Sequence, residues 1–165
     1  MKFWDSSAIV PLMIVEPSSA RVRNWFDSDS EIIVWTLTRV ELLSAIARLR
    51  REDSRSATIL TVVRRNIMRA WDGWSEITNV ELVRRHAERL VESYPLRAAD
   101  ALQLGAALIA AEGEPANLDL VTLDHNLADA AEREGFAVFG PLPGGNSNNG
   151  EMNYGGQESR LSNLL

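Results

Sequence analysis

The sequence predicts an α/β fold in which a parallel β-sheet is flanked by helices. Short apolar runs typical of strands alternate with longer segments whose apolar residues recur at helical spacing. Strands that are separated by helices form βαβ units, in which the strands pair in parallel. In such a sheet the ligand site lies at the carboxyl ends of the strands, so we expect the functional residues at that edge.

The expected strands are short and rich in apolar and β-branched residues. They occupy residues 2–4, 31–35, 75–77, 118–122 and 136–139. The run at 75–77 is the shortest and most polar of the internal ones, and we expect it at an edge of the sheet. Trp4 and Trp35 fall within strands and are expected in the core.

The segments between the strands predict helices. Ser6 and Ser7 can cap the first, and a second runs from about Ser18 to Asp27. Thr38 and Glu41 match a capping box at the start of the third. The later helices are expected at about residues 54–70, 79–94, 98–111 and 124–134.

Length and composition indicate one globular domain. The chain has 165 residues, 45% hydrophobic and 24% charged, and no cysteine. The lack of cysteine excludes a disulfide scaffold, an iron–sulfur centre and a thiol nucleophile. The apolar run from Ala8 to Val15 is too short to span a membrane, so we expect a cytoplasmic protein with no membrane partner. We expect a domain over residues 1–140 and a Gly/Asn-rich C-terminal tail over residues 141–165.

The basic residues are concentrated in one part of an acidic chain. The net charge is −6, yet residues 39–69 contain eight arginines and three acidic residues, a net charge of +5. Such a segment is either a solvated helix face or a phosphate-binding surface of guanidinium groups, and the sequence does not decide between them.

Four carboxylates stand at strand ends or helix starts. Asp5 follows the first strand and Asp124 follows the fourth, while Glu41 and Asp100 lie in the first turns of helices. The topology of a parallel sheet brings such positions to one edge. Each residue alone could be a helix cap, but four at such positions favour a common site. The apolar surroundings of Asp100 make its charge costly unless a cation or hydrogen bonds meet it.

Clustered carboxylates repel one another and therefore favour a site for divalent cations. A donor set made only of oxygen favours Mg²⁺ or Mn²⁺ over zinc. Such ions orient a phosphodiester and activate water, which indicates phosphodiester hydrolysis.

Several segments together resemble a known family. They are Asp5-Ser6-Ser7 after a short strand, Val40-Glu41-Leu42 in a helix, Leu96-Arg-Ala-Ala-Asp100-Ala-Leu-Gln-Leu, and Val121-Thr-Leu-Asp124-His-Asn-Leu-Ala-Asp-Ala-Ala. This set resembles a PIN domain, and more narrowly the VapC-type toxin ribonucleases of toxin–antitoxin pairs. The resemblance covers about residues 1–140 and implies a three-layer fold. The Gly/Asn-rich tail departs from the pattern.

The resemblance also implies a function and a set of site residues. It implies an endoribonuclease that acts on single-stranded RNA with Mg²⁺ or Mn²⁺, forms a homodimer and is silenced by a cognate antitoxin protein. By position, Asp5, Glu41, Asp100 and Asp124 become the catalytic, metal-binding cluster, with Asp5 and Asp100 as the first candidates for direct ligands. Ser7 and Thr122 become donors that orient carboxylates or water. Arg97 would contact RNA phosphate or neutralise the acidic edge.

Other functions fit the sequence less well. A phospho-receiver domain needs a lysine opposite its phosphoryl group, and the only lysine is Lys2, within a strand. A haloacid-dehalogenase-type phosphatase needs a second aspartate two residues after the first, where Ser7 stands. A PIN-fold binding module without catalysis remains the alternative, and metal affinity would discriminate it from a nuclease.

Overall fold

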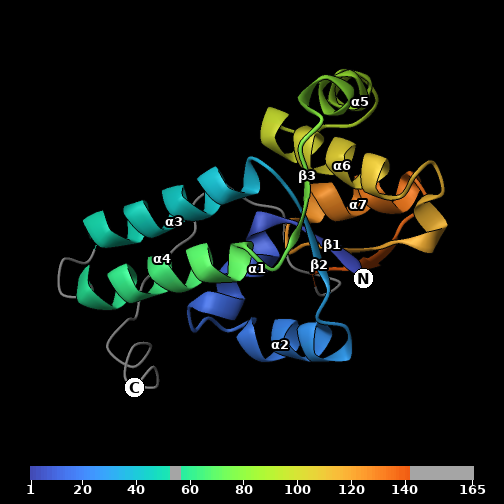
Figure 1. The fold of residues 1–165 in the computed structure, drawn as a ribbon. Coiled ribbons are helices and arrows are strands. Elements are labelled where there is room, and N and C mark those ends of the chain that lie inside the picture. The colour runs from blue at the N-terminus through green and yellow to red at the C-terminus, as the bar shows by residue number, and fades with distance from the viewer. Residues whose placement is uncertain (53–56, 142–165) are drawn as a thin grey trace.

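The computed structural model describes residues 1–52 and 57–141 and places a five-stranded parallel sheet at the centre of the molecule (Figure 1). The strand order is β3-β2-β1-β4-β5, and every neighbouring pair is parallel. The strands are β1 (Lys2–Trp4), β2 (Ile32–Trp35), β3 (Ser75–Ile77), β4 (Asp119–Val121) and β5 (Ala137–Phe139). The parallel α/β fold predicted from the sequence is therefore confirmed, with residues 75–77 at one edge.

The strand order defines where a ligand site is expected. From β1 the chain adds β2 and then β3 on one side, and it returns to add β4 and β5 on the other side. The direction of winding thus reverses between β1 and β4. A crevice opens outside the carboxyl ends of the strands at such a switch point. Asp5 follows β1 directly, and Thr122 follows β4 directly.

Helices cover both faces of the sheet and complete the three layers. They are α1 (Ser6–Met13), α2 (Ser19–Ser28), α3 (Thr38–Glu52), α4 (Ala57–Trp71), α5 (Val80–Ser93), α6 (Ala98–Ala110) and α7 (His125–Arg133). Alternate strand residues face opposite sides, so Phe3 packs with α5, α6 and α7, whereas Trp4 packs with α1 to α4. Trp4 and Trp35 are both fully buried, as predicted.

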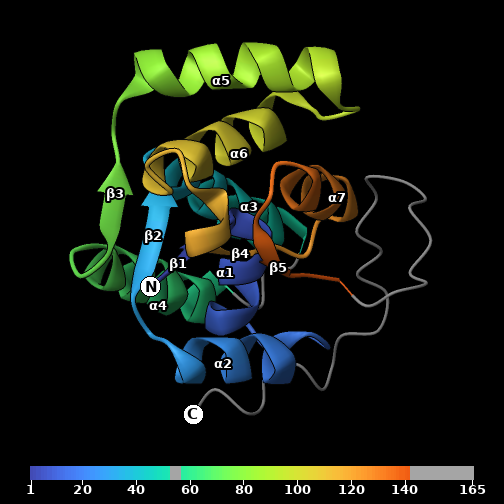
Figure 2. The same cartoon turned by 90° about the vertical axis from the view of Figure 1, so that its right-hand side faces the viewer.

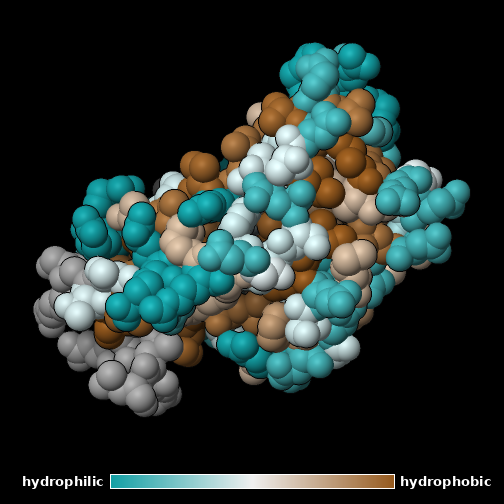
Figure 3. All heavy atoms as spheres, viewed as in Figure 1, coloured by the Kyte–Doolittle hydropathy of each residue, from teal (hydrophilic) through white to brown (hydrophobic). Residues whose placement is uncertain are grey.

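The helices α3 and α4 form an arm that extends away from the sheet (Figure 1). Leu42 and Ile46 of α3 and Leu60, Val63 and Ile67 of α4 are buried on the facing sides. Hydrophilic residues cover much of the outer surface of this arm in Figure 3. On the opposite side, α5 lies across the outside of α6 (Figure 2).

Three details differ from the sequence prediction. Asp5, rather than a serine, is the N-cap of α1 and accepts from the backbone N–H of Ser7. In place of the predicted capping box, the side chains of Thr38 and Glu41 both bind Gln103. A 3₁₀ turn at Pro115–Asn117 precedes β4 and was not predicted.

Residues 142–165 of the predicted tail lie outside the described residues. No helix within residues 1–52 and 57–141 is long and apolar enough to cross a membrane.

Close packing of α5 on α6 depends on Gly105. A Cβ added at Gly105 would lie 2.9 Å from the carbonyl oxygen of Val83 and 3.3 Å from the backbone nitrogen of Ala87. Both obstacles are backbone atoms, which cannot rotate away as a side chain can. Gly105 therefore sets the distance between the two helices, and α6 carries Asp100 in its first turn.

We predict that Gly105→Ala lowers the free energy of unfolding by about 1–3 kcal/mol, because the added methyl forces α5 and α6 apart. Chemical denaturation followed by circular dichroism measures this change. Gly73→Ala is the matched control, since a Cβ there meets nothing closer than 3.5 Å. Equal midpoints for both variants would contradict the packing argument.

Candidate active site at the carboxyl edge of the sheet

The four carboxylates singled out from the sequence lie at the N-terminal ends of four helices. Asp5 is the N-cap of α1 and Asp124 is the N-cap of α7, where it accepts from the backbone N–H of Leu127 at 2.8 Å. Glu41 and Asp100 lie in the first turns of α3 and α6. A helix N-terminus stabilises a nearby negative charge through its free N–H groups. The free N–H groups of these helix N-termini thus partly stabilise the negative charge of each carboxylate.

Asp5 is the most buried member of the cluster, with 4% of its surface exposed. Its Oδ2 atom accepts hydrogen bonds from the Thr122 hydroxyl at 2.9 Å, from the backbone N–H of Ser7 at 3.2 Å and from the Ser7 hydroxyl. Its Oδ1 atom has only a long contact of 3.4 Å with the Ser6 hydroxyl. The carboxylate is therefore held through one oxygen, which leaves Oδ1 as the oxygen with the greater capacity for a ligand.

Ser7 and Thr122 connect Asp5 to the loop that carries Asp124. The Ser7 hydroxyl accepts from the backbone N–H of Leu123 at 2.8 Å, and the Thr122 hydroxyl accepts from the backbone N–H of Asp124 at 3.0 Å. Thr122 is fully buried. Each hydroxyl thus accepts a hydrogen bond from a backbone N–H of the β4–α7 loop and donates a hydrogen bond to Asp5. These hydrogen bonds support the positioning role expected of Ser7 and Thr122, which stays a prediction.

Glu41 is held by a buried amide that the sequence analysis did not select. Gln103 on α6 is 1% exposed, and its Nε2 atom donates to the Glu41 carboxylate at 2.9 Å. The same Nε2 atom lies 2.9 Å from the hydroxyl of Thr38, which is fully buried. Gln103 therefore ties the start of α3 to the helix that carries Asp100.

The carboxylates are close enough to influence one another's protonation. The negative charge of Asp124 raises the pKa of both Asp5 and Asp100. The charge of Asp5 in turn raises the pKa of Glu41 and of Asp100. For all three raised groups, however, burial is the larger cause. Asp5 therefore lies at the electrostatic centre of the cluster.

The pKa of Asp100 is raised to about 6, first by burial and then by the charges of Asp124 and Asp5. A backbone hydrogen bond with Arg97 and the positive charge of Arg97 act in the opposite direction. Arg97 is itself exposed at the start of α6. One of its two predicted roles, partial neutralisation of the acidic edge, is thus supported by this electrostatic contact.

The donor set fits a hard divalent cation. It consists of carboxylate oxygens that repel one another, which is the chemistry that Mg²⁺ and Mn²⁺ relieve. Within residues 1–52 and 57–141, no three or more histidine or acidic side chains are arranged as a ready metal-ligand group. Mg²⁺ usually keeps several waters and takes only one or two protein carboxylates, so pairs within this cluster are sufficient.

The sequence thus indicated the carboxylates and the two hydroxyls that hold Asp5, but not the side chains around Glu41. Thr38 and Gln103 were not among the predicted site residues. Gln103 carried a readable signal, because it is a polar residue three positions after Asp100 in an otherwise apolar helix. Thr38 was predicted to be part of a capping box with Glu41 rather than part of the site.

All of the described arginines of the predicted basic segment lie on the arm. Those that are exposed are Arg39, Arg50, Arg51, Arg64, Arg65 and Arg69. Arg39 lies one turn or less from Glu41 on α3, and its guanidinium stacks over Trp71 at 5.9 Å from the ring centroid. The arm therefore carries exposed positive charge along both α3 and α4.

A family model and several known proteins are similar to this chain over most of its length. The family model described as PIN domain matches residues 2–133. Ribonuclease VapC47 of Mycobacterium tuberculosis is 29% identical over 86% of this chain and 97% of its own length. Ribonuclease VapC45 of the same organism is 30% identical over 82% of this chain and 92% of its own length.

Two solved structures share the fold at low sequence identity. A toxin–antitoxin complex from Klebsiella pneumoniae has a TM-score of 0.58 at 13% identity and covers 78% of this chain and 91% of its own. The structure of FitAB bound to an IR36 DNA fragment has a TM-score of 0.62 at 18% identity, covering 90% of this chain and all of its own. Similarity at this level supports the fold.

The raised pKa of Asp100 predicts a pH-dependent stability of the metal-free protein. The group contributes stability below its unfolded pKa of 3.8, and this contribution is lost as the pH rises through about 6. We expect Asp100→Asn to be more stable than the parent at pH 7 by about 1 kcal/mol, a value reduced for solvent screening at a half-exposed carboxyl. The difference should vanish near pH 4.

Urea denaturation of chelator-treated protein between pH 4 and 7 measures this difference. Asp119→Asn is the matched control, because it removes one negative charge at the opposite end of β4. A parent that is as stable as Asp100→Asn at pH 7 would show that the carboxylates do not repel as described.

Proposed function

This chain belongs to the PIN domain family, and we propose that it is a metal-dependent endoribonuclease that hydrolyses phosphodiester bonds in single-stranded RNA. The observation that carries the proposal is the convergence of Asp5, Glu41, Asp100 and Asp124 at the switch point of the sheet. Burial and mutual repulsion raise the pKa of three of these groups. A fold that maintains such repulsion at a ligand-binding edge is well suited to hold a cation.

The relatives support the ribonuclease activity, and the donor chemistry supports the metal. VapC45 and VapC47 are ribonucleases by name and align over most of this chain. Mg²⁺ or Mn²⁺ would be held by Asp5, Asp100, Glu41 and Asp124, with Asp5 and Asp100 as the first candidates for direct ligands. When bound, such an ion orients the phosphodiester, activates water and stabilises the charge of the leaving oxygen.

The other residues of the site hold and orient these groups. Ser7 and Thr122 fix Asp5 through its Oδ2 atom, and Oδ1 keeps only the 3.4 Å contact with the Ser6 hydroxyl. Gln103 fixes Glu41. The N-terminal N–H groups of α6, which has no side-chain cap, offer positive partial charge to a phosphate at this edge.

The exposed arginines provide a path for the rest of the substrate. RNA binding depends on contacts with phosphates, and guanidinium groups bind phosphate oxygens in pairs. The arm formed by α3 and α4 carries exposed arginines, and its helix α3 also carries Glu41 of the acidic cluster. We propose that these residues bind the RNA backbone.

We further propose that the protein is the toxin component of a toxin–antitoxin system, acts in the cytoplasm and forms a homodimer. The toxin–antitoxin complex from Klebsiella pneumoniae has the same fold. A cognate antitoxin protein would then be its second partner, besides RNA. The alternative of a catalytically inactive binding module is favoured by one observation, the lack of a ready three-ligand metal group in the described part of the chain.

We predict that Asp100→Asn reduces RNA cleavage in Mg²⁺ or Mn²⁺ by at least about a hundredfold while the protein stays folded. The products of the parent should carry 5′-phosphate and 3′-hydroxyl ends. Incubation of purified protein with total cellular RNA, followed by end-specific ligation and sequencing, tests both points. Total RNA is used because a narrow target would escape a single oligonucleotide.

Glu132→Gln, a change of equal charge on the exposed side of α7, is the control and should cleave as the parent does. Normal cleavage by Asp100→Asn would refute the site assignment. Products with 2′,3′-cyclic phosphate ends would refute the hydrolytic mechanism.

A further inference from the structure

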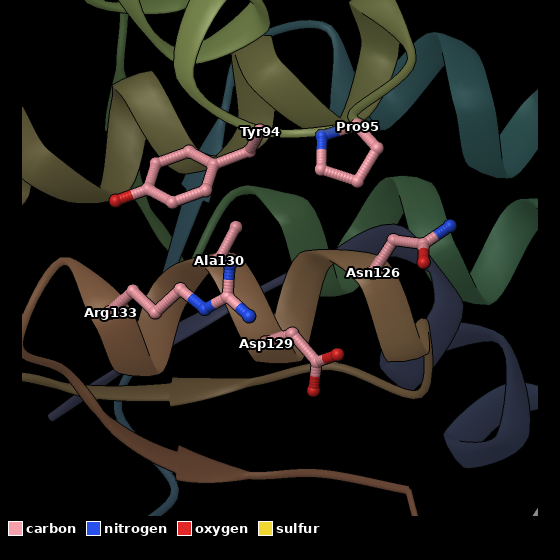
Figure 4. A pocket seen from close by; sticks show the side chains of 6 residues that line it. All are labelled: Tyr94, Pro95, Asn126, Asp129, Ala130 and Arg133. Carbon is pink, nitrogen blue, oxygen red and sulfur yellow. The ribbon is translucent and has the colours of Figure 1, made fainter.

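The hollow between Tyr94 and α7 is too small to add a ligand pocket to the acidic edge (Figure 4). It holds about 50 Å³, which is room for a few water molecules, whereas pockets for small-molecule ligands span about 300–1,000 Å³. The Tyr94 hydroxyl donates to Glu134 at 2.8 Å, and Glu134 also accepts two hydrogen bonds from Arg89, at 2.9 and 2.6 Å. These bonds hold α5 against the end of α7.

Gln103 is a buried polar side chain that close packing of the core does not require. It lies on α6 with 1% of its surface exposed, and its neighbours Ala101 and Leu104 are fully buried. Burial of an amide costs free energy that its hydrogen bonds only offset, so an apolar side chain of similar size would pack at this position at least as well. The presence of an amide here is therefore explained by its partners.

The amide of Gln103 contacts two residues of one helical turn at the same time. Its Nε2 atom donates to Oε2 of Glu41 at 2.9 Å and to the hydroxyl of Thr38 at 2.9 Å. The Thr38 hydroxyl also donates to Oε1 of Gln103 at 3.2 Å. A reversed amide would set its oxygen against the Glu41 carboxylate, so these partners fix the orientation of the amide.

The two contacts fix both the helix and the carboxylate. Thr38 and Glu41 are three residues apart in the first turn of α3, so their side chains project from the same face. The bond to Thr38 holds the start of α3, and the bond to Glu41 holds the side chain itself. Thr38 is fully buried, so water does not readily replace Gln103 as its partner. Gln103 thus sets the position of Glu41 from α6, whose first turn carries Asp100.

We propose that Gln103 is a positioning residue for the cation of the acidic edge and that it acts through Glu41. The proposal rests on the proposed function and adds the residue that sets Glu41 relative to Asp100. A free glutamate side chain loses rotamer freedom when it binds an ion, and one that a hydrogen bond already holds loses less. Partners of this kind behind a metal ligand commonly change metal affinity by about 10–100-fold.

Gln103→Met removes the amide and keeps the approximate length of the side chain. We expect this variant of the full chain to bind Mn²⁺ at least about tenfold more weakly than the parent, with free Mn²⁺ measured by electron paramagnetic resonance. Leu104→Met is the matched control, because it introduces the same side chain at the next buried position of α6. It should bind Mn²⁺ as the parent does.

Variants of Thr38 separate the contact with the helix from the contact with the carboxylate. Thr38→Val should weaken Mn²⁺ binding less than Gln103→Met does, because the direct bond from Gln103 to Glu41 remains. Thr38→Ser keeps the hydroxyl and should bind Mn²⁺ as the parent does. A Thr38→Ser variant as weak as Thr38→Val would contradict the role of this hydroxyl.

A double-mutant cycle with Glu41→Gln separates positioning from a general disturbance of the fold. If Gln103 acts through Glu41, then Gln103→Met should change the Mn²⁺ affinity of Glu41→Gln by about twofold or less. An equal loss in the parent and in Glu41→Gln would overturn the proposal, because Gln103 would then affect the acidic edge by another route.

Stability is measured on the double variant Thr38→Val/Gln103→Met. Removal of both buried partners together leaves neither one unpaired, so this variant should unfold at the same urea concentration as the parent or at a higher one. It should nevertheless bind Mn²⁺ as weakly as Gln103→Met does. A double variant that binds Mn²⁺ as tightly as the parent would overturn the proposal.

The outcomes distinguish this proposal from the proposed function. Unchanged Mn²⁺ binding by Gln103→Met, together with lost binding by Asp100→Asn, would overturn the role of Gln103 and leave the metal site standing. Weakened binding by Gln103→Met without metal-dependent cleavage of RNA by the parent would support the role of Gln103 and overturn the nuclease. Failure of the parent to bind Mn²⁺ would overturn both.

Discussion

The burial of the Asp5 carboxylate is the constraint on which the rest of this structure depends. A negative charge with 4% exposure is stable only if hydrogen bonds replace the water it has lost. Ser7 supplies two of these bonds and Thr122 supplies a third. Because Thr122 and Leu123 follow β4, the carboxylate also fastens the ends of two neighbouring strands to each other. The buried Asp5 carboxylate thus holds the carboxyl ends of β1 and β4 in position.

The remaining carboxylates depend on where the helices begin. The helices α1, α3 and α7 follow the carboxyl ends of β1, β2 and β4, whereas α6 follows α5, and the charges of Asp5 and Asp124 act on Asp100 in its first turn. The helices also need to be correctly spaced. Gly105 lets α5 approach α6 closely, and Gln103 ties α6 to α3. Packing and polar bonding therefore act together to place Asp100 opposite Asp5 and Asp124.

The sequence predicted what depends on periodicity and on strand ends. Short strands, amphipathic helices and the positions of the four carboxylates can be read from spacing alone, and these predictions agree with the structure. The partners of Glu41 could not be read in this way, because Gln103 is 62 residues distant along the chain. Thr38 and Glu41 matched a local capping box, and a tertiary contact with a buried amide replaced it. The Tyr94–Glu134–Arg89 bonds likewise join residues whose proximity only the packing of α5 and α7 reveals.

We propose that the acidic edge of the sheet binds a divalent cation. Titration of Mn²⁺ into the purified protein, with free Mn²⁺ followed by electron paramagnetic resonance, tests it without knowledge of the RNA target. We expect the parent and Asp119→Asn to bind Mn²⁺ alike and Asp100→Asn to bind it at least about tenfold more weakly. Equal binding by the parent and Asp100→Asn, or no binding by either up to millimolar Mn²⁺, would contradict a metal site and identify the four carboxylates as helix caps.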